Sequence, residues 1–179
     1  MLQVLSGNFK MVTLRDIIRK PLGLNKLRSM LPSDSKALLY AELAKDTRPR
    51  QAIFKGLRSL VVLYETKIQN KSQGHWVVLI PRAHSIEYFS SLGRSPTDEM
   101  HALHQDPTVF GRILGKNFTY NRAKLQLQSY NVDDCGYWAL SRAILVDYKL
   151  GDFQKLFRGR TVRSSDEMMG LMTLLLANR

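Results

Sequence analysis

Two short, continuous apolar runs lie in the middle of the chain, at residues 60–64 and 76–80. Both are rich in β-branched and aromatic residues and are bounded by turn-forming residues, which predicts strands. Runs without polar alternation are typical of strands that are buried on both faces. We expect the polar segment 69–74 to connect them. Residues 86–90 form a third expected strand, which ends at Ser91, Leu92 and Gly93.

Helices are expected on either side of these strands. Residues 35–46 have high helix propensity, with Ser33 or Asp34 as the cap candidate. Residues 107–114 also suggest a helix, and 117–120 and 124–128 suggest short strands. A capping box that starts at Ser164 and includes Glu167 predicts a last helix over residues 165–177.

The segment after Gly136 has a different pattern. Residues 137–150 are apolar on most faces, with polar interruptions at Ser141, Arg142, Asp147 and Lys149. This pattern predicts a helix packed through the centre of the domain, with Gly151 as a plausible end. Together the elements predict an α+β fold in which helices frame a small mixed sheet. We expect one domain over residues 1–179, and only short helices within 1–33.

The composition is that of an ordinary folded protein, with 179 residues, 44% hydrophobic and 23% charged. No apolar run approaches the roughly 20 residues of a membrane helix. The net charge is +12, and residues 1–74 carry 14 basic against 5 acidic side chains. This excess favours a polyanionic partner such as nucleic acid, or simply a solvated basic face. No zinc-finger, RNP or basic-zipper pattern is present.

The single cysteine, Cys135, is expected where an irregular polar segment becomes the buried helix. The positive end of a helix dipole favours thiolate over thiol, and Gly136 allows another chain to approach closely. One cysteine cannot form an internal disulfide, and the N-terminus lacks the pattern of a secretory signal. We therefore expect a reducing, intracellular environment.

A thiol nucleophile needs an imidazole within hydrogen-bond reach. His75 is the best of the four histidines, because it is expected to start a strand beside Gly74 and to project at the sheet edge. The alternative is that Cys135 is a small buried apolar residue and His75 a structural one. His101 and His104, with Asp98 nearby, lack the further strong ligands that zinc needs, so no metal site is expected.

Four motifs in order carry a resemblance to a known family. His75-Trp76, then Ser91-Leu92-Gly93, then Gln128, then Asp134-Cys135-Gly136 resemble the adenain-type and ubiquitin-like-protein cysteine proteases. These include maturation proteases of adenoviruses, virophages and Polinton-like viruses, and the SUMO-processing enzymes. Gln128 precedes Cys135 by seven residues, as in the viral members. The resemblance covers residues 75–145, whereas residues 1–60 carry no recognised motif.

The resemblance implies a role for each of these residues. Cys135 would be the nucleophile, His75 the general base, and Gln128 a donor to the oxyanion hole, with Trp76 and Gly136 beside the substrate. It further implies cleavage of viral capsid or virion precursors after small residues such as Gly, in the virion or at the assembly site. The chemistry needs no cofactor, and DNA is a possible activator through the basic N-terminal part. We expect a monomer without a membrane partner.

One position departs from the family pattern. The acid that orients the histidine usually precedes the Leu-Gly turn by two or three residues, and Ser90 stands there. Ser90 could orient His75 weakly beside a Cys-His dyad, Glu87 could reach in from the opposite strand face, or activity could be lost. The alternative functions are a ubiquitin-like-protein deconjugating protease, a catalytically silent nucleic-acid or assembly module, and an unrelated basic nucleic-acid-binding protein.

Overall fold

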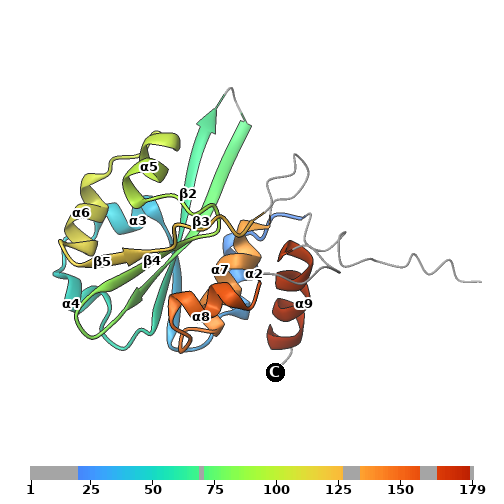
Figure 1. Ribbon diagram of the computed structural model, residues 1–179. Helices are drawn as coiled ribbons and strands as arrows, with labels where there is room; N and C mark the ends of the chain where they lie inside the picture. Colours follow the sequence, from blue (N-terminus) through green and yellow to red (C-terminus); the bar gives the residue numbers. More distant parts are fainter. Residues whose placement is uncertain (1–19, 69–70, 127–133, 158–164, 178–179) are drawn as a thin grey trace, which may run out of the picture.

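The computed structural model describes residues 20–68, 71–126, 134–157 and 165–177. Within these ranges one sheet of five strands runs in the order β1-β2-β3-β4-β5 (Figure 1). The strands β2, β3 and β4 form an antiparallel meander, and the outer strands β1 and β5 each pair in parallel with their neighbour. Their bounds are β1 (Ser35–Leu39), β2 (Ser59–Ile68), β3 (Lys71–Pro81), β4 (Ile86–Ser90) and β5 (Phe118–Tyr120).

Helices cover both faces of this sheet, which confirms the predicted α+β class (Figure 1). One face, called here the α5 face, is covered by α3 (Tyr40–Lys45), α4 (Arg50–Ile53), α5 (Pro96–Ala102) and α6 (Thr108–Leu114). The other, called here the α7 face, is covered by α2 (Leu24–Met30), α7 (Cys135–Ile144), α8 (Leu150–Lys155) and α9 (Ser165–Ala177).

Alternation along the central strands assigns each side chain to one of two cores. In β3, Val77 and Leu79 belong to the core under the α5 face, whereas Trp76, Val78 and Ile80 belong to the core under the α7 face. Both sets are buried. This explains why the predicted strands 60–64 and 76–80 read as continuous apolar runs.

The prediction of one helix over residues 35–46 is wrong in its first half. Residues 35–39 form β1, which pairs in parallel with residues 59–63 of β2, and the helix α3 begins only at Tyr40. Ala37 and Leu38 are buried by this pairing. Tertiary contacts therefore override the helix propensity of the segment.

The long helix predicted to run to residue 150 begins at Cys135 and is shorter than predicted. It is α7, which ends at Ile144, and Gly151 lies inside α8 instead of ending a helix. Beyond this end, the guanidinium of Arg142 donates to the carbonyl oxygens of Leu145 at 2.6 Å and Tyr148 at 3.0 Å. The carbonyl of Leu145, which has no backbone partner within the helix, thus has a donor in the buried Arg142.

Most other predicted elements are confirmed. The structure has β4 at 86–90 and α9 at 165–177 as predicted, and α6 and β5 start one residue later than predicted. Residues 124–126 form no strand, and residues 127–128 and Ser164 lie outside the described residues. The connection predicted over 69–74 is largely strand, because β3 begins at Lys71. Among the helices described, none combines the length and apolarity required to cross a membrane.

Candidate active site

His75 lies inside β3, so the prediction that it starts a strand is wrong. On the side of β4, however, pairing begins only at Val77, which faces Ser90. His75 is therefore located just past the end of the neighbouring strand. Its side chain shares the α5 face with Val77 and is 6% exposed.

Ser90 contacts the imidazole of His75 directly. Its Oγ lies 3.1 Å from Nε2 of His75, and the serine is fully buried. The same Oγ accepts a hydrogen bond from the backbone N–H of Leu92 at 3.3 Å, which fixes the hydroxyl in place. The structure thus brings together the histidine and the residue that stands at the position of the usual acid.

Glu99, which no sequence motif marks, also reaches the imidazole. This glutamate comes from α5, and its Oε1 lies 3.4 Å from Nε2 of His75. The hydroxyl of Tyr88 donates to its Oε2 at 3.4 Å, and Glu99 is 0% exposed. Ser95 caps α5, with Pro96 at its first position, a pattern that signals a helix start. This signal could have located the helix but not the contact with His75.

Glu87 does not serve His75. It lies on the α7 face, where its carboxylate accepts from Arg142 Nε at 2.7 Å and from Arg82 Nη2 at 2.8 Å. Both Glu87 and Arg142 are buried, so the pair is a structural link between β4 and α7. Of Glu87 and Glu99, only Glu99 contacts the histidine.

The surroundings of His75 favour a neutral ring that can take up a proton. Burial lowers the pKa of His75, the nearby carboxylate of Glu99 acts in the opposite direction, and the charge of Arg94 lowers it further. Ser90 and Glu99 both approach Nε2, so a proton on Nε2 satisfies them. Nδ1 is then the nitrogen that can accept a proton from a thiol.

The end of β4 and the turn after it contact residues 121–126, which precede Cys135 in the chain. The side chain of Asn121 accepts from the backbone N–H of Ser90 at 2.9 Å and donates to its carbonyl at 2.5 Å. Ser91 Oγ donates to Gln126 Oε1 at 2.6 Å. Gly93 has φ +69°, and a Cβ there would lie 2.7 Å from the backbone of Ala123. The glycine of this motif is therefore required both by its conformation and by the closeness of the neighbouring chain.

Cys135 is the first residue of α7, as predicted, and is half-buried against the core under the α7 face. The next residue of the helix, Gly136, packs on β3 at Trp76, the residue after His75. A Cβ on Gly136 would lie 3.2 Å from the indole ring of Trp76. The Trp76 Nε1 donates to the carbonyl of Leu22 at 3.0 Å, which holds the ring. Cys135 and His75 are thus each the chain neighbour of a residue in this contact.

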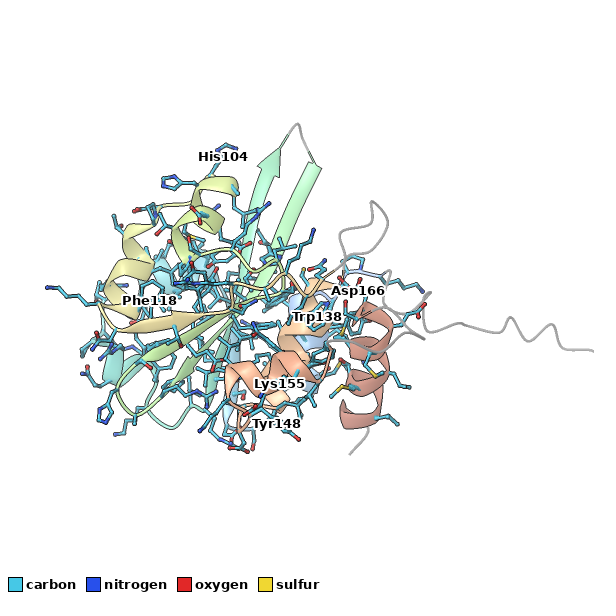
Figure 2. The ribbon with its side chains drawn as sticks, in the orientation of Figure 1. His104, Phe118, Trp138, Tyr148, Lys155 and Asp166 are labelled. Carbon is cyan, nitrogen blue, oxygen red and sulfur yellow. The ribbon has the colours of Figure 1, made fainter. Side chains whose placement is uncertain are left out.

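Asp134 and Asp166 form a buried acidic pair beside the helix start. Burial, reinforced by the neighbouring Asp166, raises the pKa of Asp134 to about 9. Figure 2 shows Asp166 on α9 next to Trp138 on α7, whose Nε1 donates to the carboxylate of Asp166 at 3.0 Å. A neutral Asp134 adds no negative charge beside Cys135, so it does not oppose the thiolate that the helix terminus favours.

The remaining candidates lie elsewhere. Gln128 is outside the described residues. His84, His101 and His104 are exposed, and His101 lies on α5. Within the part of the chain that the structure describes, no group of three or more His, Cys, Asp or Glu side chains could hold a metal ion.

A scan against protein-family models found no match, and neither did a search of curated proteins. Among solved structures, the chain is similar to the SUMO protease Ulp1 with its catalytic cysteine oxidised to a sulfonic acid. The match has 14% identity and a TM-score of 0.46, and covers 89% of this chain and 79% of that chain. A likeness at this level does not assign an activity to the present chain.

Proposed function

We propose that this chain is a cysteine protease in which Cys135 is the nucleophile and His75 the general base. The observation that carries the proposal is the contact of Gly136 with the Trp76 ring, because it sets the first turn of α7 against β3 at the residue after His75. A half-buried thiol at a helix N-terminus and an imidazole fixed through Nε2 are the two components that thiol catalysis needs.

The reaction follows from these positions. Nδ1 of His75 accepts the thiol proton, and the sulfur of Cys135 attacks the carbonyl carbon of the scissile bond. The electron pair moves to the carbonyl oxygen, where the backbone N–H of Cys135 and the amide of Gln128 would donate hydrogen bonds. Collapse breaks the C–N bond while His75 protonates the leaving amine. Water then hydrolyses the thioester, with His75 taking its proton and returning it to the sulfur.

For the substrate, we propose viral capsid or virion precursors cleaved after small residues such as Gly, in the virion or at the assembly site. The support is the motif resemblance, in which Gln128 precedes Cys135 by the interval of the viral members. The resemblance also puts Trp76 and Gly136 beside the substrate, and because both are buried against each other they would limit the space there rather than offer a broad surface.

Nucleic acid is the proposed tether or activator. In the described part of the N-terminal region, eight basic side chains are exposed, which suits a contact with phosphates that weakens with salt. They are Lys20, Lys26, Arg28, Lys36, Lys45, Arg48, Lys55 and Arg58.

The test is labelling of the purified chain with a thiol-reactive peptide ending in Gly-Gly, at neutral pH and low salt, with and without DNA. We expect rapid modification of Cys135 in the wild type and a loss of at least about a hundredfold in His75→Ala. His84→Ala is the matched control, because His84 is exposed and lies in the connection between β3 and β4.

The other functions give different results. Equal, slow labelling of wild type and His75→Ala would overturn the protease and support a silent binding module. Cleavage of ubiquitin-like tails in preference to capsid-precursor peptides would support the deconjugating enzyme. Labelling that DNA does not change would remove the proposed activator but leave the protease.

A further inference from the structure

We infer that Glu99 is the charged positioning residue of His75, supplying from α5 the negative charge that Ser90 cannot supply from β4. The inference deepens the proposed function and rests on it for its catalytic meaning. Two contacts carry it: Oε1 of Glu99 and Oγ of Ser90 approach the same nitrogen, Nε2, at 3.4 Å and 3.1 Å.

The surroundings of Glu99 indicate that its negative charge interacts mainly with His75. The residue is 0% exposed, and among the described residues the only basic group within ion-pair distance of its carboxylate is His75, which is charged only when it is protonated. Its other oxygen receives a long hydrogen bond from the neutral hydroxyl of Tyr88. A buried carboxylate without a cation is costly, so Glu99 gains most when His75 is protonated. That state is formed when the imidazole has taken the thiol proton.

Ser90 and Glu99 together would perform the two roles, orientation and charge stabilisation, that a single acid performs in the family pattern. The hydroxyl of Ser90 is fixed by Leu92 and sets the direction of the ring, whereas Glu99 adds the charge that stabilises the imidazolium. A structural carboxylate would be expected to pair with a lysine or arginine, as Glu87 does with Arg82 and Arg142 on the opposite face.

The other ionisable groups around His75 do not replace Glu99. Tyr64 on β2 and Tyr88 on β4 are buried, and burial raises the pKa of both phenols well above the ordinary value, so both are neutral. Arg94, after β4, carries a positive charge and lowers the pKa of His75. Cys135 is the proposed proton donor. Glu99 is thus the acidic side chain described next to this ring.

The decisive measurement is the pKa of His75, followed by NMR of the imidazole, in the wild type and in Glu99→Gln. We expect the pKa of His75 to fall by about one unit or more in the variant, because an opposite charge within 4–6 Å shifts a pKa by that amount. Asp98→Asn is the matched control. It removes the same charge from the neighbouring residue of α5, whose carboxylate is exposed and accepts from Ser95.

Labelling of Cys135 provides the second readout. In Glu99→Gln we expect at least a tenfold slower reaction at neutral pH, with half-maximal reactivity shifted to higher pH. Glu99→Asp keeps the charge on a shorter side chain and should give intermediate values, and it stands in for Glu99→Gln if that variant does not fold.

The outcomes separate this inference from the proposed function. An unchanged His75 pKa in Glu99→Gln, or an equal change in Asp98→Asn, would overturn the role of Glu99. It would do so even if labelling of Cys135 still depends on His75. A second result is possible, in which the pKa of His75 falls in Glu99→Gln but not in Asp98→Asn, and Cys135 does not react in the wild type. This result would support the pairing of Glu99 with His75 and would reject the protease.

Discussion

At the level of single residues, the charge that stabilises a histidine need not come from the adjacent strand. Ser90 holds the position next to His75 on β4, while the carboxylate of Glu99 arrives from a helix. Both contact Nε2, so on the role inferred for Glu99 the two positions are alternative origins for the same charge. The serine remains useful because its hydroxyl can both donate and accept.

Moving the carboxylate from position 99 to position 90 tests this equivalence. We expect the double variant Ser90→Asp with Glu99→Gln to regain most of the His75 pKa and the Cys135 reactivity that Glu99→Gln loses. Ser90→Asp alone should gain little, because two buried carboxylates beside one imidazole raise each other's pKa. NMR titration of His75 and the rate of thiol labelling measure both effects. A double variant no better than Glu99→Gln would contradict the equivalence.

At the level of elements, the essential contact is between the first turn of α7 and β3. Gly136 is buried there, and a Cβ would lie 2.7 Å from Cβ of Leu22 and 3.2 Å from the ring of Trp76. Glycine is normally unfavourable in a helix, so its presence here reflects the close approach of the helix to the strand.

Replacing this glycine should therefore reverse the usual effect of alanine in a helix. We expect Gly136→Ala to lower the free energy of unfolding by about 1–3 kcal/mol, as overpacking does, and to slow the labelling of Cys135. Gly151→Ala in α8 is the control, because nothing lies within 4 Å of a Cβ there. Gly151→Ala should raise the free energy of unfolding by up to about 1 kcal/mol. Urea unfolding of both variants measures the difference, and equal effects would contradict the close packing.

Local patterns predicted the elements whose character is set by their own residues. The apolar runs of β2 and β3 and the last helix, 165–177, are of this kind. Residues 35–39 were predicted as helix because their strand character depends on β2, a partner 24 residues away along the chain. The sequence predicted Cys135, His75 and Ser90 as site residues, and the structure brings His75 and Ser90 into contact. It could not point to Glu99, because the significance of that residue depends on how α5 docks on the sheet.

At the level of the whole molecule, the residues of the candidate site come from two layers. His75, Ser90 and Glu99 lie on the α5 face, whereas Cys135 begins a helix on the α7 face and Asp134 precedes it. The acidic pair of Asp134 and Asp166 joins α7 to α9, and Figure 2 shows Asp166 beside Trp138. The second layer therefore contains a buried group that titrates in the alkaline range.

This pair should make stability fall as the pH rises. The pKa of Asp134 is raised to about 9, so between its unfolded value near 3.8 and about 9 the folded chain holds a proton that the unfolded chain has released. Stability is then greatest at the acidic end of this range and is lost toward pH 9, by at most about 1.4 kcal/mol per pH unit for one proton. Asp134→Asn should flatten the slope. Urea unfolding at several pH values measures it, and identical slopes would contradict the raised pKa.

The position of Glu99 on α5 also affects how related chains can be found. A search pattern that demands an acid two or three residues before the Leu-Gly turn rejects this chain, since Ser90 stands there. A pattern that accepts a serine at that place, followed by a glutamate in the first turns of the next helix, would retain it. On the role inferred for Glu99, genomes screened with the stricter pattern would miss chains that carry this charge on the helix instead of the strand.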